Sequence, residues 1–290
     1  MKHLRSFFAV LLAAAVCAAV VLFSGCGASV QVQQLTIPGE RGSIHATLTT
    51  PANAENMPAV VICHGFTGNR QLDGHAKPLA KTLAQHGIAS IAIDFAGSGE
   101  SEEPFTAYTP ANMRDDITSA ITYLTDTVGA DPERIGLLGH SMGSFLTRTY
   151  LIRYPGTVDA AIIMGTGWQP EMTIRGGLLL AGILSGLKGP DAVSKMVTNM
   201  AFGAYNKAFG DKPRTPNDWL SADTDNVDRY MADPLCGADA TVGLFRQMLH
   251  GIRFNQRQSH LRQMDREMPV LFVAGDKDPV GSCGKGVRQT

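Results

Sequence analysis

One short segment, the pentapeptide GHSMG at residues 139–143, constrains this sequence more than any other feature. The residues before it, 134–138 (RIGLL), are typical of a strand buried in a sheet, and from Met142 onward the sequence has a helical pattern. A strand that turns directly into a helix leaves little room for side chains, which accounts for a glycine on each side of Ser141. The segment therefore predicts a serine hydroxyl projected above a sheet, at the start of a helix whose N-terminus faces a developing negative charge.

Strands and helices alternate on both sides of this turn. Continuous apolar runs predict strands buried on both faces, and amphipathic runs predict helices between them. The expected strands lie at residues 30–37, 43–50, 58–65, 88–95, 134–138, 158–165 and within 268–281, and the expected helices at 77–86, 111–127 and from 142. This order predicts an α/β fold, with a mostly parallel sheet covered by helices on both faces.

The alternation stops from about residue 168 to residue 266, where the sequence is mainly helical or irregular. Because strands lie on both sides of this segment, we expect a helical cap that shapes access to a site. One apolar run in it either lines an acyl tunnel, touches a bilayer or packs as an ordinary helix: Leu178, Leu179, Leu180, Ile183, Leu184 and Leu187. Trp219, with Asp218 and Arg214 nearby, is a candidate for the polar end of such a site.

Composition limits the class of protein. The chain has 290 residues, 44% of them hydrophobic, and a formal net charge of −1. These values fit one domain with an insertion and argue against nucleic acid as a partner, which requires a basic face. Outside the N-terminal segment the cysteines are Cys63, Cys236 and Cys283, whose spacing matches no zinc site, so we expect ordinary thiols and no bound metal.

Residues 1–26 differ from the rest of the chain. A positive start with Lys2 and Arg5 precedes an almost wholly apolar run that ends in FSGC at Cys26, which is typical of an export signal and resembles a bacterial lipobox. We expect a signal peptide at 1–26, lipid attached to Cys26, and one folded α/β domain at 27–290 that is exported and held at the outer side of a bacterial cell membrane. The alternative is an uncleaved membrane anchor.

Two further motifs supply partners for an attacking serine. HGFTG at residues 64–68 follows a predicted strand, and we assign the two oxyanion donors to the backbone N–H groups of Phe66 and Met142. His64 is expected to brace this loop. The acid that orients a base is expected after the last strand, where Asp278 is placed to turn back into the site and Asp276 is the reserve. Asp94, at the end of another predicted strand, is expected to hold a loop.

The base itself is not evident. All eight histidines precede Asp278, and His250 and His260, in or beside the cap, are the distant alternatives. We therefore expect that the protein continues past Thr290 with one more strand, a helix and a histidine. The competing hypothesis is an inactive protein that binds acyl ligands at a membrane.

Two groups of motifs carry a family resemblance. HGFTGNR and IDFAGSGES are similar to the bacterial cinnamoyl and feruloyl esterases. GHSMGSFLTR, RTPNDWLSADTDNVDRYMADPLCG and VAGDKDPVGSCGKGV resemble bacterial lysophospholipases and monoacylglycerol lipases of the serine aminopeptidase-like group. The resemblance implies an α/β-hydrolase fold and a serine ester hydrolase that acts on monoacylglycerol- or lysophospholipid-type acyl esters, without metal or organic cofactor. A peptidase or amidase on the same scaffold is the alternative.

Overall fold

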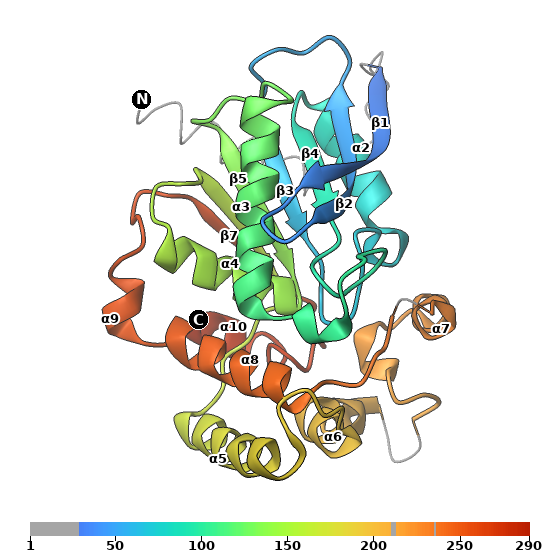
Figure 1. The fold of residues 1–290 in the computed structure, drawn as a ribbon, viewed down its shortest axis with the longest axis vertical. Coiled ribbons are helices and arrows are strands. Elements are labelled where there is room, and N and C mark those ends of the chain that lie inside the picture. The colour runs from blue at the N-terminus through green and yellow to red at the C-terminus, as the bar shows by residue number, and fades with distance from the viewer. Residues whose placement is uncertain (1–28, 210–212, 235) are drawn as a thin grey trace.

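A seven-stranded sheet forms the centre of the computed structural model, which describes residues 29–209, 213–234 and 236–290 (Figure 1). The strand order is β1-β2-β4-β3-β5-β6-β7. The strands are β1 (Val30–Pro38), β2 (Ser43–Pro51), β3 (Ala59–Cys63), β4 (Ala89–Ile93), β5 (Ile135–His140), β6 (Ala160–Met164) and β7 (Val270–Val273). β1 and β2 are antiparallel to their neighbours, whereas β4, β3, β5, β6 and β7 are parallel. The predicted mostly parallel sheet is confirmed, and the predicted signal peptide with Cys26 lies outside the described residues.

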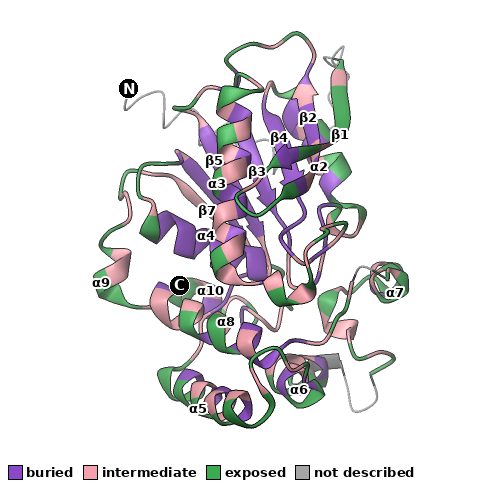
Figure 2. Cartoon of the chain, in the orientation of Figure 1, coloured by how far each residue is buried: buried purple, intermediate pink, exposed green. Residues whose placement is uncertain are grey.

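Helices cover both faces of the sheet. One layer consists of α3 (Pro110–Asp126) and α4 (Met142–Arg153), whose buried residues form a single core with β3, β4 and β5. On the opposite face α2 (Ala76–Gln85) packs Leu83 against the side chains of alternate strand residues. Because β3 and β4 contact both layers, every residue in them is buried, which explains their continuous apolar sequence (Figure 2).

The start of α3 follows from its local sequence. Thr109 is the N-cap residue, and its hydroxyl accepts a hydrogen bond from the N–H of Asn112, while Pro110 occupies the first helical position. One stripe of apolar residues along α3 faces the sheet. Its buried residues are Met113, Ile117, Ala120 and Leu124, and Ile121 beside them is partly buried. This stripe holds α3 against the sheet.

Between β6 and β7 the chain forms helices at the carboxyl end of the parallel strands (Figure 1). They are α5 (Glu171–Lys188), α6 (Lys195–Phe202), α7 (Thr224–Ala232), α8 (Val242–Asn255) and α9 (Gln258–Leu261), with short 3-10 turns at Tyr205–Phe209 and Asp218–Leu220. α5 packs against α8, which in turn packs against α4. α10 (Lys285–Gln289) follows β7. In the described part of the chain, no helix combines the length and apolar character needed to cross a bilayer.

Candidate active site

Ser141 stands at the turn between β5 and α4 in an unusual backbone conformation. Its φ and ψ angles are 52° and −119°, outside the regions that non-glycine residues prefer. Its own N–H donates to the carbonyl oxygen of Met164 at 2.9 Å, which ties the turn to the end of β6. Such a conformation costs about 1–3 kcal/mol and persists where the surrounding structure imposes it, most often at functional sites.

The two glycines of the pentapeptide are required by packing. A Cβ atom on Gly139 would come within 2.4 Å of the hydroxyl oxygen of Thr147 in α4. A Cβ atom on Gly143 would lie 2.5 Å from the carbonyl oxygen of Cys63 and 2.6 Å from that of His64. Neither distance is tolerated, so glycine at both positions lets α4 approach the sheet closely enough to form the turn.

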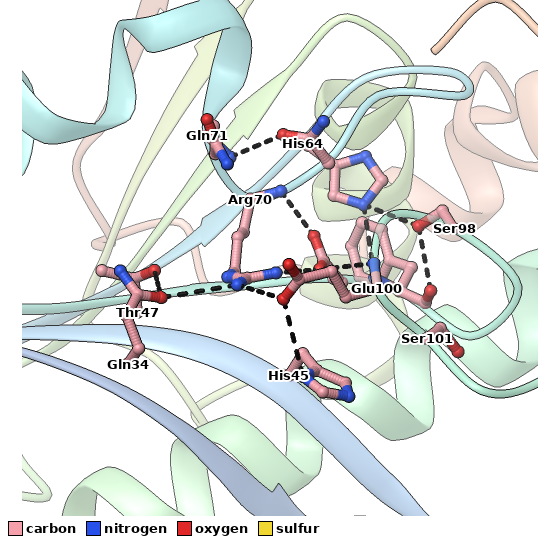
Figure 3. A network of polar contacts seen from close by, with 12 residues as sticks. Gln34, His45, Thr47, His64, Arg70, Gln71, Ser98, Glu100 and Ser101 are labelled. Atoms are coloured by element: carbon pink, nitrogen blue, oxygen red, sulfur yellow. Dashed lines mark hydrogen bonds and ion pairs between the residues drawn. The ribbon is translucent and has the colours of Figure 1, made fainter. Parts of the chain in front are cut away.

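His64 is fully engaged in hydrogen bonds. The N–H of Phe95 donates to its Nε2 at 3.2 Å, so Nδ1 carries the proton and donates to the carbonyl oxygen of Gly65 at 2.8 Å. The Ser98 hydroxyl lies 3.1 Å from the same Nε2 (Figure 3). Burial lowers the pKa of His64, which keeps the ring neutral. These contacts leave the ring no free nitrogen with which to act as a base.

Tyr108 completes the support of this loop and was not predicted from the sequence. Its buried hydroxyl donates to the carbonyl oxygen of Gly65 and accepts from the N–H of Thr67, both at 3.0 Å. The N–H of Phe66, between these two anchored residues, has no acceptor in the described structure. No local pattern marks Tyr108, because it precedes α3 and reaches the loop only through the fold.

Met142, the other expected donor, is the first residue of α4. Its N–H has no acceptor within the described residues, as expected for the first turn of a helix. A Cβ atom on Gly65 would lie 3.0 Å from Cβ and 3.5 Å from Oγ of Ser141, so the loop that carries Phe66 directly faces the serine. Two free backbone donors therefore border the Ser141 hydroxyl.

The carboxylate of Asp278 lies across Gly165 from the serine. A Cβ atom on Gly165 would be 3.6 Å from the Ser141 nitrogen and 3.8 Å from Oδ2 of Asp278. The N–H of Val280 donates to Oδ1 at 2.9 Å, and burial raises the pKa of this carboxyl. Asp276 is exposed at the tip of the same turn. Of the two aspartates considered, the structure brings Asp278 toward Ser141.

Asp94 holds two loops together, as expected. Its carboxylate accepts the backbone N–H of Arg70 at 2.7 Å and that of Glu100 at 3.0 Å, and it pairs with the Arg70 guanidinium. Arg70 also pairs with Glu100 at 2.5 Å (Figure 3). The buried carboxylate thus joins the segment after the 64–68 loop to the segment after β4, which fixes the loop that carries Phe66.

A cavity of about 90 Å³, the serine cavity, is lined by Ser141, by the loop after β3 and by residues of the cap. Its large apolar and aromatic lining residues are Phe66, Leu72, Phe202, Trp219, Leu220 and Tyr230. The rings of Phe202 and Trp219 are stacked with their centres 5.6 Å apart, and the ring centres of Phe202 and Phe66 are 5.1 Å apart. Arg214 pairs with Asp218 and Asp228 and does not line the cavity.

α5 does not line the serine cavity. Its buried apolar residues, Ile174, Ala181 and Leu184, belong to the core of the cap. Met172, Leu179 and Leu187 on its other side are 76%, 68% and 77% exposed. The apolar run that the sequence marks is thus partly a packing face and partly an open surface.

No described histidine joins Ser141 to Asp278. His140 lines the serine cavity beside Ser141, and burial lowers its pKa to about 4, but it makes no hydrogen bond to the serine. His260 donates through Nδ1 to the carbonyl oxygen of Phe254, in a part of the structure away from the serine cavity. Within the described residues no group of three histidine, cysteine or acidic side chains is arranged to bind a metal.

The fold and site can be compared with known proteins. The model of the family described as serine aminopeptidase, S33, matches residues 54–288. This chain belongs to that hydrolase family. The (lyso)-N-acylphosphatidylethanolamine lipase of Homo sapiens is 30% identical over 83% of this chain and 72% of that protein. An uncharacterized 31.7 kDa protein of Escherichia coli is 33% identical, but the match spans only about a third (34%) of either chain.

Solved structures agree on the fold. A carboxyl esterase from Bacillus coagulans superimposes with a TM-score of 0.76 at 22% identity, over 89% of this chain and 84% of that one. A monoacylglycerol lipase from Paleococcus ferrophilus gives a TM-score of 0.57 at 19% identity, over 89% and 82%. The fold is that of an esterase/lipase-type α/β hydrolase, as the sequence motifs predicted.

Proposed function

We propose that this protein hydrolyses carboxylic esters of lipid-like acyl groups through an acyl-serine intermediate. The observation that carries the proposal is the geometry around Ser141: a strained serine at a strand-to-helix turn, bordered by two free backbone N–H groups and faced by a carboxylate. This arrangement suits a nucleophile, an oxyanion hole and the acid that orients a base.

In the proposed mechanism, Ser141 Oγ attacks the ester carbonyl and loses its proton to an imidazole base, a group that none of the described residues supplies at this position. The N–H groups of Phe66 and Met142 hold the oxyanion that forms. The base, oriented by Asp278, returns the proton to the leaving alcohol, and water then releases the acid by the same steps in reverse order.

The lining of the serine cavity supports an acyl substrate with a polar end. Four aromatic side chains, Phe66, Phe202, Trp219 and Tyr230, line the cavity. The indole N–H of Trp219 is buried without an acceptor in the described structure. We propose that this N–H donates to the alcohol part of the ester. A cavity of about 90 Å³ is smaller than the roughly 300–1,000 Å³ of most ligand sites, so a long acyl chain requires Phe202 and its neighbours to move aside.

The similarity to a (lyso)-N-acylphosphatidylethanolamine lipase and to a monoacylglycerol lipase supports glycerol-based lipid esters as the substrate class. The family description suggests aminoacyl amides as the alternative. A panel of p-nitrophenyl esters, monoacylglycerols, lysophospholipids and aminoacyl amides distinguishes them. Faster turnover of the amides than of every ester would refute the proposal.

The role of each group can be tested with added imidazole. Because no described histidine contacts Ser141, we expect millimolar imidazole to accelerate ester hydrolysis by the 290-residue chain. The acceleration should vanish in Ser141→Ala and weaken in Asp278→Asn, and it should survive in His140→Ala. Equal acceleration in the presence and absence of Ser141 would show that the hydrolysis occurs in solution rather than in the site.

We propose that the protein is an exported lipoprotein at a bacterial cell membrane, on the basis of the FSGC pattern at Cys26. The exposed apolar side chains of α5 are of the kind that contacts a lipid surface. Mass spectrometry of the N-terminal peptide tests for a diacylglyceryl cysteine. Release of Cys26→Ser from the membrane fraction is expected, and its unchanged retention there would contradict the proposal.

A further inference from the structure

A second cavity, of about 360 Å³, opens between α3, α4, α8 and α9. We call it the basic cavity, because its lining contains four arginines and two histidines and no aspartate or glutamate: Arg114, Arg153, Arg253, Arg257, His250 and His260. It shares no lining residue with the serine cavity. An anion in it would therefore occupy a site separate from Ser141.

The positive charge of this cavity is only partly compensated. Arg253 pairs with Glu171 at 2.6 Å, just outside the lining. Arg257 contacts no carboxylate among the described residues and is exposed at the cavity rim. Burial, followed by the charges of Arg246 and Arg253, lowers the pKa of His250. The cavity thus retains an excess of positive charge at neutral pH.

Two further arginines are positioned without being neutralised. The guanidinium of Arg153 lies 4.6 Å from the ring centre of Phe254, and the ring centre of His260 lies 4.1 Å from that of Phe254. Arg114 donates to the carbonyl oxygen of Pro110, and its Nε is buried without an acceptor in the described structure. Buried donors normally have an acceptor, so the Nε–H of Arg114 requires a ligand or a water molecule to accept its hydrogen bond.

We propose that the basic cavity binds a phosphate group, carried either by a small phosphate ester or by an anionic phospholipid. Guanidinium groups recognise phosphate through paired hydrogen bonds, and a dianion with several oxygens can accept from Arg114, Arg153 and Arg257 together. An apolar pocket lined by Met142 and Phe145 shares Thr149 with the basic cavity, so the phosphate site lies on the same side of α4 as Met142. The proposal does not depend on the reaction at Ser141.

Isothermal titration with glycerol 3-phosphate at constant ionic strength tests this site. We expect saturable binding that weakens about tenfold in Arg153→Gln and in Arg257→Gln, since each removes a charge-assisted hydrogen bond. The matched control is Arg262→Gln, which removes an exposed charge near α9 but outside the lining and should bind like the wild type. Melting curves of all three variants establish that they fold.

Vesicles distinguish the source of the phosphate. Binding to phosphatidic acid vesicles that is lost in Arg153→Gln, with no binding to phosphatidylcholine vesicles, identifies an anionic lipid. Binding of glycerol 3-phosphate without binding to vesicles identifies a soluble ester. The proposal is overturned if neither probe binds, or if Arg153→Gln and Arg257→Gln bind both probes as tightly as Arg262→Gln does.

Discussion

The substitution Gly143→Ala tests the physical basis of the serine turn. Its Cβ would lie 2.5 Å from the carbonyl oxygen of Cys63, whereas real Cβ contacts are essentially never shorter than 3.0 Å, so α4 must move away from β3 by about 0.5 Å. Overpacking of this kind costs about 1–3 kcal/mol, and the lower entropy of alanine in the unfolded chain offsets about 0.4–1 kcal/mol. We expect a net loss of about 1–2 kcal/mol.

That loss corresponds to a fall in melting temperature of about 2–8 °C, at roughly 2–4 °C per kcal/mol for a chain of this size. Activity should fall further, because the shift moves Ser141 and the Met142 N–H together. A misplacement of about 1 Å can cost about 100-fold, so a shift of half that size is expected to lower kcat/KM for a p-nitrophenyl ester about tenfold.

Gly182→Ala in α5 is the matched control. A Cβ there meets no heavy atom within 4 Å, so the same chemical change should stabilise the helix by about 0.5–1 kcal/mol and leave kcat/KM unchanged. Differential scanning calorimetry tests the expected changes in stability of both variants, and ester kinetics tests the expected changes in kcat/KM. If Gly143→Ala melts no lower than the wild type and keeps its kcat/KM, close packing of α4 on β3 does not form the turn.

Three further outcomes are expected. Asp94→Ala leaves the buried Arg70 with Glu100 as its one remaining carboxylate partner among the described residues. It should lower the free energy of unfolding measured in urea by about 3 kcal/mol, and a loss below about 1 kcal/mol would contradict this reading. Phe202→Ala opens the serine cavity and should raise the ratio of long-chain to short-chain ester turnover, and an unchanged ratio would mean that this ring does not limit chain length. Burial raises the pKa of Asp116 to about 6, so between its unfolded value near 4 and this value the folded state binds more protons. The stability of the wild type relative to Asp116→Asn should therefore increase as the pH falls from 7 to 5 in denaturant titrations, and a pH-independent difference would argue against the raised pKa.

The local sequence determined the sheet and its central turn. Strands buried on both faces need continuous apolar residues, so β3, β4 and β6 were predicted to within two residues at each end. The tight turn at Ser141 needs glycine on both sides for steric reasons, and this requirement is visible in five consecutive residues. Such features are readable because each depends on neighbours along the chain.

The tertiary structure decided which distant groups meet. Only the fold shows that both nitrogens of His64 are occupied, that the Tyr108 hydroxyl anchors the residues beside Phe66, and that Asp278 rather than Asp276 approaches the serine. The arginines of the basic cavity come from α3, α4 and the segment around α8 and α9, and none of them forms a motif in the sequence. Periodicity tells which face of an element is buried, but the contacts between side chains of separate elements arise only when those faces pack.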